Sequence, residues 1–170
     1  MNVERLRELQ APLKSRYRDD PGAAAITLRA RGEIGQESLA CRVETGRALV
    51  EAGLHPATGG SGLQACSGDM LLEALAACAG VTLSAVATAL GIEIKGGTVN
   101  IEGDLDFRGT LGVAKDALIG FKAIRLAFAL DTDASEEQLA SLLKLTERYC
   151  VVLQTLRVPA QTSAILARAE

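Results

Sequence analysis

The apolar positions at the start of the chain change from a helical to a strand-like spacing. Apolar residues recur every three or four positions from Val3 to Leu13, which predicts a short amphipathic helix that Pro12 ends or kinks. After a Pro-Gly turn, residues 24–35 and 37–46 alternate in polarity as half-buried strands do. The two runs flank a polar turn, so they predict a β-hairpin.

The middle of the chain carries a long run without charge. Ala74 to Ile92 is 19 residues of mostly small apolar side chains, long enough to be considered as a membrane span. Its abundant alanine, its lack of aromatic residues and its flanking Glu73 and Glu93 are not typical of such a span. The run instead predicts a central helix of a soluble domain, buried on nearly every side.

That helix has start and stop signals and follows a loop. Ser67 or Asp69 can cap its first turn, and Gly91 can end it. The segment from Gly53 to Gly68 is rich in Gly, Pro, Ser and Thr and shows no hydrophobic period, so it predicts a loop. Loops of this length inside compact domains are commonly functional.

The second half of the chain predicts two strands, a capped helix and a last strand. Residues 92–107 and 121–132 alternate in polarity and lie close in sequence, which predicts an antiparallel pair. Ser135-Glu-Glu-Gln138 is a capping-box pattern at the start of a helix that reads through to Cys150. Residues 160–169 can supply a further strand.

Length and the order of these elements narrow the fold class. A chain of 170 residues is the size of one domain, here residues 1–170 with residues 1–20 as a helical extension. Strands and helices are grouped rather than strictly alternating. The sequence therefore predicts an α+β fold with a mostly antiparallel sheet and a long central helix.

Charge and aromatic content argue against nucleic acid as a partner. Lys and Arg number 18 against 21 Asp and Glu, a net charge of −3, and three Phe and two Tyr are the only aromatic residues besides one His. The N-terminal residues are charged throughout and lack the apolar core of a signal peptide. We therefore expect a cytoplasmic protein with reduced cysteines and no membrane partner.

The sequence predicts neither a metal site nor a nucleotide cofactor. The four cysteines, at 41, 66, 78 and 150, lack the paired spacing of zinc ligands, and a single histidine cannot form a cluster. The glycine-rich Gly59 to Gly62 lacks the Lys-Ser/Thr ending of a phosphate loop. We expect His55 to make a loop contact, Cys41 to lie in the core and Cys66 to be a spare buried or loop thiol.

Cys78 and Cys150 are the cysteines placed on predicted helices. A free cysteine is most often a small buried hydrophobe, so a reactive role needs a cause that lowers the thiol pKa. Cys78 lies too deep in its helix for the dipole of that helix to act on it. The sequence therefore predicts a nearby cation, for which the candidates are Arg29, Arg31, Arg42 and Arg148.

The sequence around both cysteines resembles the OsmC/Ohr family, the osmotically inducible and organic hydroperoxide resistance proteins. The resemblance is carried by residues 66–78 (CSGDMLLEALAAC), by residues 82–94 and by residues 145–156 (LTERYCVVLQTL). It implies an OsmC-like α+β fold that forms an intertwined homodimer and reduces organic hydroperoxides. It further implies that Cys78 is the peroxidatic thiolate, that Cys150 is the resolving thiol and that a lipoyl- or thioredoxin-type dithiol is the reductant.

One position departs from the family pattern. Family peroxidases carry a Glu ten residues before the first cysteine, where this chain has Gly68. Asp69 is the nearest acid, but on a continuous helix it lies about 180° round from Cys78, and Glu73 lies about 140° round. The resemblance places the partner arginine on the first strand, where Arg29 and Arg31 share a face. Arg31 is favoured because it lies nearer the turn.

Two functions therefore remain open. The first is a thiol peroxidase that uses Cys78 and Cys150 with Arg31 and Asp69. The second is a catalytically weak relative that keeps the dimeric fold as a small-molecule-binding or stress-response module.

Overall fold

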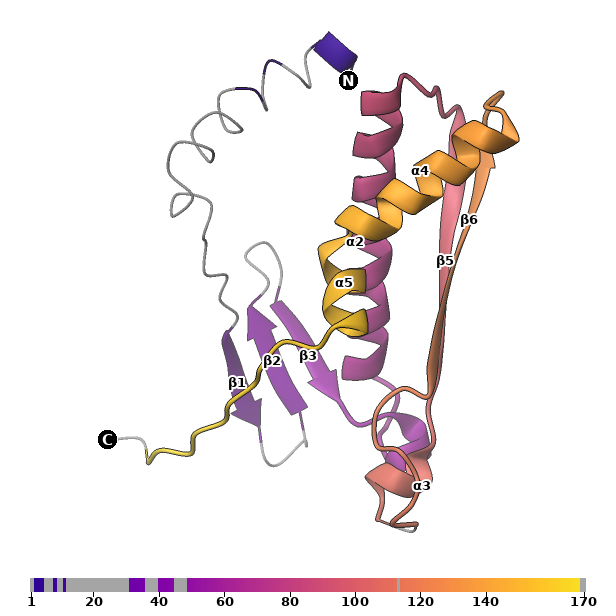
Figure 1. Cartoon of the computed structure of the whole chain (residues 1–170). Helices are drawn as coiled ribbons and strands as arrows, with labels where there is room; N and C mark the ends of the chain where they lie inside the picture. The colour runs from indigo at the N-terminus through magenta and orange to yellow at the C-terminus, as the bar shows by residue number, and fades with distance from the viewer. Residues whose placement is uncertain are drawn as a thin grey trace.

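The computed structural model describes residues 2–4, 8, 11, 31–35, 40–44, 49–112 and 114–168, with backbone alone for 31–35, 40–44 and 49. Most of the predicted N-terminal helix and the first half of the predicted hairpin lie outside these residues. Val3 and Glu4 are helical. The described part contains two sheets and one long helix with two further helices against it (Figure 1).

The first sheet has four short strands in the order β1-β2-β3-β4. Their bounds are Arg31–Gly35, Ala40–Glu44, Leu49–Gly53 and Ala65–Cys66. β1 and β2 are antiparallel with Gly35 opposite Ala40, which confirms the predicted hairpin. β2 and β3 are also antiparallel, whereas β3 and β4 are parallel. The sequence had not predicted β3 or β4.

The predicted loop after residue 53 is largely a loop. It contains the single-turn helix η2, Pro56–Thr58, which ends at Gly59 with φ of 94°, a conformation that favours glycine. The His55 side chain begins this turn, because its Nδ1 accepts a hydrogen bond from the Ala57 N–H at 3.0 Å. The loop then enters β4 and the long helix directly.

Helix α2, Ser67–Leu90, has the predicted bounds and ends at Gly91 with φ of 70°. Its N-cap residue is Cys66, with no side-chain capping bond, so the predicted cap by Ser67 or Asp69 is wrong. Because the helix already begins at Ser67, Asp69 lies in its first turn.

Only one face of α2 is buried in the chain. The buried residues recur every fourth position, which is the spacing of one helix face: Leu75, Ala79, Leu83 and Ala87. On another face Val81 is 72% exposed. The prediction of burial on nearly every side is therefore wrong for the single chain. α2 is long and apolar enough to cross a membrane, yet its buried face packs on β5, α4 and α5.

The predicted antiparallel pair is confirmed as β5, Gly96–Asp104, and β6, Ala123–Asp131. Their side chains alternate between the two faces of this two-stranded ribbon. Val99, Ile101 and Leu126 pack toward α2, whereas Arg125 on the outer face pairs with Glu102 at 3.0 Å. The connection between the strands contains the short helix α3, Phe107–Thr110.

Two helices follow the ribbon and lie against α2 (Figure 1). α4, Glu136–Tyr149, begins with the predicted capping box, in which Ser135 and Gln138 each accept a hydrogen bond from the other's backbone N–H. α5, Val151–Arg157, was not predicted. Cys150 alone separates the two helices.

The predicted last strand is absent from the described C-terminal residues. Residues 159–168 have neither helix nor strand. A strand needs a hydrogen-bonded neighbour, and this segment pairs with no strand of the two described sheets after it leaves α5. Ile165 and Leu166 are 93% and 99% exposed.

Candidate active site

Cys78 and Cys150 come together where α2 meets the junction of α4 and α5. Cys78 lies at the middle of α2 and is half-buried, whereas Cys150 is fully buried in the cluster formed with Leu75, Ala79 and Leu153. Both thiols are free, Cys78 packs against the cluster that contains Cys150, and each thiol shifts the pKa of the other. Two cysteines 72 residues apart in sequence thus form one thiol pair.

The break between α4 and α5 determines where Cys150 sits. The Cys150 N–H donates to the Thr146 carbonyl at 2.9 Å, as in a helix, but ψ of 105° turns the chain out of α4 at that residue. The Cys150 carbonyl then accepts the Gln154 N–H at 2.9 Å and starts α5. The first N–H groups of a helix have no partner within that helix. Those of Val151 and Val152, at the start of α5, act on the Cys78 thiol.

These contacts lower the pKa of the Cys78 thiol below its ordinary value. Burial, the largest single influence, opposes ionisation and raises the pKa. Hydrogen bonds from the Val152 N–H, the Cys150 thiol, the Val151 N–H and the Thr82 hydroxyl favour the thiolate and together outweigh burial. Cys78 is therefore the more acidic member of the pair.

The pKa of Cys150 is shifted in the opposite direction. Burial raises it most, and the thiol and charge of Cys78 raise it further, against hydrogen bonds from the Leu153 and Val152 N–H groups. Ionisation of Cys78 thus keeps Cys150 protonated, since two thiolates in contact repel each other. Cys78 is therefore the member that ionises to the thiolate, and Cys150 is the member that stays a neutral thiol.

Within the part of the chain that the structure describes, the lowered pKa of Cys78 has a cause other than the predicted cation. The groups that lower its pKa are hydrogen-bond donors, two of them on the backbone of α5. These donors could not be predicted from the sequence, because its pattern predicted one helix ending at Cys150 and did not predict α5. Arg148 instead stacks on Tyr149, with its guanidinium carbon 5.5 Å from the ring centre.

The predicted arginine partner stays a prediction. Arg29 lies outside the described residues, and the backbone alone is described for Arg31 and Arg42. β1 and β2 therefore give no side-chain geometry toward the thiols.

Asp69 and Glu73 are exposed on α2, away from the thiol of their own chain. Nine helical steps lead from Asp69 to Cys78, roughly 13 Å along the axis. A side chain at Gly68 would start beside Phe121, Cys66 and Leu105, at 3.5 to 3.6 Å, and not beside Cys78. The catalytic role assigned to Asp69 by resemblance stays a prediction.

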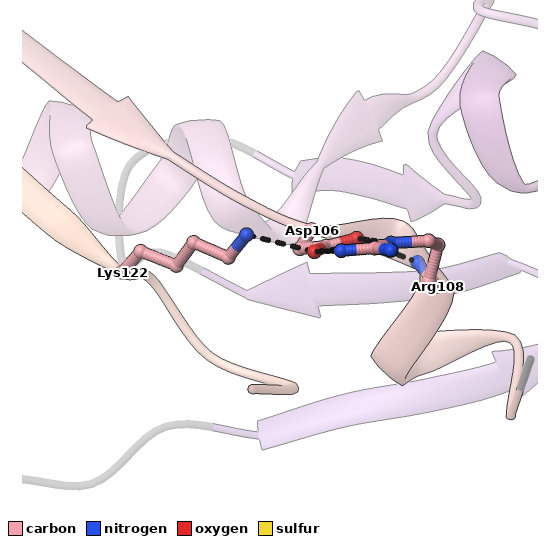
Figure 2. Close-up of polar contacts among 3 residues, drawn as sticks. All are labelled: Asp106, Arg108 and Lys122. Carbon is pink, nitrogen blue, oxygen red and sulfur yellow. Dashed lines mark hydrogen bonds and ion pairs between the residues drawn. The ribbon is translucent and has the colours of Figure 1, made fainter. Parts of the chain in front are cut away.

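A separate polar cluster joins α3 to the start of β6 (Figure 2). The Asp106 side chain is only 10% exposed, and it accepts hydrogen bonds from the Arg108 guanidinium at 2.6 Å and from Lys122 Nζ at 2.7 Å. These two cations hold the pKa of the Asp106 carboxyl well below its usual range. Next to the cluster, His55 stacks on Phe107 with ring centres 4.9 Å apart, a loop contact as expected. The sequence had not singled out Asp106.

A cavity opens between α2, β6 and α5, lined by apolar side chains and by the charged Lys122, Glu147 and Arg157. Its volume is about 550 Å³, and its walls include Leu71, Ile124, Leu126, Leu153 and Leu156. Four of these also pack in the cluster around Cys78 and Cys150: Ile124, Leu126, Leu153 and Leu156. The surroundings of the thiol pair are therefore apolar, apart from the hydrogen-bond donors aimed at Cys78.

Comparisons with known proteins agree with this arrangement. A family model described as OsmC-like protein matches residues 60–163. The OsmC-like protein of Mycoplasma pneumoniae has a similar structure, with TM-score 0.66 and 18% identity over 79% of this chain and 89% of that one.

Two organic hydroperoxide resistance proteins also share the fold. The protein from Elizabethkingia anophelis has TM-score 0.64 and 15% identity over 79% of this chain and 91% of that one. The protein from Legionella pneumophila has TM-score 0.61 and 17% identity over 78% and 90%. No curated protein matches the sequence.

Proposed function

Since this chain belongs to the OsmC-like protein family, which includes organic hydroperoxide reductases, we propose that it is a thiol-dependent peroxidase that reduces organic hydroperoxides. One observation carries the proposal. A half-buried thiol of lowered pKa, Cys78, contacts a buried thiol of raised pKa, Cys150. A two-cysteine peroxidase uses one thiol as the nucleophilic thiolate and keeps the second, resolving thiol protonated until it reacts.

In the first step the Cys78 thiolate attacks the terminal oxygen of the hydroperoxide. An S–O bond forms, the O–O bond breaks, and two electrons pass from sulfur to the peroxide. The alkoxide takes up a proton and leaves as an alcohol, while Cys78 becomes a sulfenic acid. The N–H groups of Val151 and Val152 favour the thiolate before the attack.

In the second step Cys150 resolves the sulfenic acid. Its sulfur attacks the Cys78 sulfur, an S–S bond forms, and the sulfenic oxygen leaves as water with the thiol proton. An external dithiol of lipoyl or thioredoxin type then reopens the disulfide by exchange and is itself oxidised. The contact between the two thiols favours this step over further oxidation of Cys78.

The apolar surroundings favour an organic substrate over hydrogen peroxide. The cavity of about 550 Å³ shares four apolar wall residues with the cluster around the thiol pair, and that part of its wall suits an alkyl group. We further propose that the protein works as a cytoplasmic intertwined homodimer, with Arg31 and Asp69 completing the site. The dimer and the two site residues come from the family resemblance, and the compartment comes from the N-terminal sequence.

A catalytically weak, ligand-binding relative is the second candidate. It is favoured by Gly68 at the position of the family glutamate and by the exposure of Asp69, roughly 13 Å along the helix from Cys78. The two candidates differ in whether peroxide is consumed.

The test treats the reduced protein with a stoichiometric organic hydroperoxide, follows peroxide loss and maps disulfides by mass spectrometry. We expect a Cys78–Cys150 disulfide in the wild type and no peroxide loss in Cys78→Ser. Cys150→Ser should react once with the stoichiometric hydroperoxide and accumulate over-oxidised Cys78 only when excess hydroperoxide is added. Cys66→Ser serves as the matched control, because Cys66 caps α2 outside the pair, and should behave as the wild type. Persistent peroxide with reduced thiols in the wild type would favour the second candidate.

A further inference from the structure

Helices α4 and α5 are braced against each other across the break at Cys150. The Gln154 side-chain amide donates to the main-chain carbonyl of Glu147 at 2.7 Å. Arg157 Nη2 lies 2.7 Å from Glu147 Oε1. Glu147 belongs to α4 whereas Gln154 and Arg157 belong to α5, so both contacts cross the break between the helices, which meet at an angle beside α2 (Figure 1).

The Gln154 contact replaces a helical hydrogen bond. In an unbroken helix the Glu147 carbonyl would accept the N–H of Val151, four residues on. Here the Gln154 side-chain amide occupies the Glu147 carbonyl, and the Val151 N–H, at the start of α5 beside Cys78, lowers the pKa of the Cys78 thiol. A side-chain donor has thus taken the place of a backbone donor, which is left free for the thiol.

We propose that Gln154 is a positioning residue, which holds the break between α4 and α5 open and so keeps the Val151 and Val152 N–H groups directed at Cys78. The inference deepens the proposed function and rests on it, because Cys78 is the thiol proposed to attack the peroxide. Arg157 contributes less. Its ion pair with Glu147 is half-exposed, and such pairs are weak and screened by salt.

Loss of the Gln154 donor leaves the Glu147 carbonyl unsatisfied. The carbonyl then competes with the Cys78 sulfur for the Val151 N–H, and the two helices tend to join. The thiolate loses a donor, so its fraction at neutral pH falls.

The experiment measures the ionisation of Cys78 and not turnover. The rate of iodoacetamide alkylation of reduced protein is followed against pH, with the modification localised to Cys78 by peptide mass spectrometry. We expect Gln154→Met, which keeps length but lacks a donor, to move the profile to higher pH and slow alkylation at pH 7 by about threefold to tenfold. Hydrogen exchange at Val151 and Val152 should change in the same variant.

Thr155→Val is the matched control. Thr155 donates to the Val151 carbonyl at 2.9 Å within α5 and does not bridge to α4, so its removal should leave the profile unchanged. An unchanged profile in a folded Gln154→Met, or an equal shift in Thr155→Val, would overturn the proposal. Should Gln154→Met fail to fold, Gln154→Asn, whose amide is one methylene shorter, is measured with the same expectation.

The alkylation readout separates this inference from the proposed function. A shifted profile in Gln154→Met together with a wild type that consumes no peroxide would support the role of Gln154 and refute the peroxidase. An unshifted profile in Gln154→Met together with a wild type that consumes peroxide would refute the role of Gln154 and support the peroxidase.

Discussion

Thr82 differs from the neighbouring hydroxyl residues of α2 in what its side chain contacts. Ser84 and Thr88 donate to the carbonyls of Gly80 and Ser84, at 3.0 and 2.8 Å, which is the common arrangement for hydroxyls inside helices. The Thr82 hydroxyl instead contacts the sulfur of Cys78, one turn back on the same face. Thr82 is therefore a direct contributor to the acidity of the thiol.

We predict that Thr82→Val raises the pKa of Cys78. The substitution keeps the side-chain shape and removes one hydrogen bond that favours the thiolate. The pH profile of Cys78 alkylation should move to higher pH, with a rate at pH 7 lower by about twofold to threefold. Thr88→Val, which loses a bond to a carbonyl only, should leave the profile in place. Equal profiles for both variants would show that the Thr82 hydroxyl does not act on the thiol.

The sequence allowed the two cysteines to be chosen but not the groups that act on them. The Ala-rich run ending at Cys78 and the Arg-Tyr-Cys segment carry the family resemblance. The N–H donors of Val151 and Val152 are available because the helix breaks at Cys150. No Gly or Pro near Cys150 predicts that break. The pKa of Cys78 therefore could not be explained before the geometry was known.

Elements with strong local signals were predicted and elements defined by pairing were not. α2 has Gly91 at its end, α4 has a capping box, and β5 and β6 alternate in polarity over nine residues each. β3 and β4 are short, and they are strands because they pair with adjacent strands of the sheet. That pairing cannot be recognised from their own sequences. The expected strand at 160–169 failed for the same reason, since alternation alone supplies no hydrogen-bond partner.

The short helix α3 depends on a single carboxylate. Asp106 begins α3 by accepting the Arg108 backbone N–H at 3.2 Å, and it also binds Lys122 at the start of β6. Because the pKa of Asp106 lies lower in the folded state than in the unfolded chain, the carboxylate stabilises the fold above about pH 4. That contribution is lost as the pH falls below this value.

We predict that Asp106→Asn lowers the Tm at pH 7 by a few degrees, because an amide caps the helix but does not attract two cations. The difference from the wild type should shrink as the pH is lowered from 7 to about 3. Thermal unfolding followed by circular dichroism at several pH values measures it. Asp133→Asn, whose side chain is 87% exposed and pairs with Lys95, should change the Tm little at either pH. A constant difference across the pH range would contradict the role of the ionised carboxylate.

The described part of the molecule leaves apolar surface uncovered. Val81 on α2 is 72% exposed, and the segment after α5 exposes Ile165 and Leu166 almost completely. Such features are expected of a subunit whose remaining surface is covered by a second copy. A second copy is not part of the single chain. The face of α2 that it would cover is therefore exposed here, although the sequence predicted burial of α2 on nearly every side.

We therefore predict that the protein is a homodimer of about 35 kDa, twice the 17.7 kDa of the chain, and that the exposed face of α2 contributes to the interface. Light scattering after size exclusion measures the mass. Val81→Glu places a charge on this face and should shift the protein toward the monomer, because a buried unpaired carboxylate is costly. Ala140→Glu, an exposed position on α4, is the control and should keep the wild-type mass. A wild-type protein that is monomeric at micromolar concentration would contradict the dimer, whereas a dimer that survives Val81→Glu would place the interface on another surface.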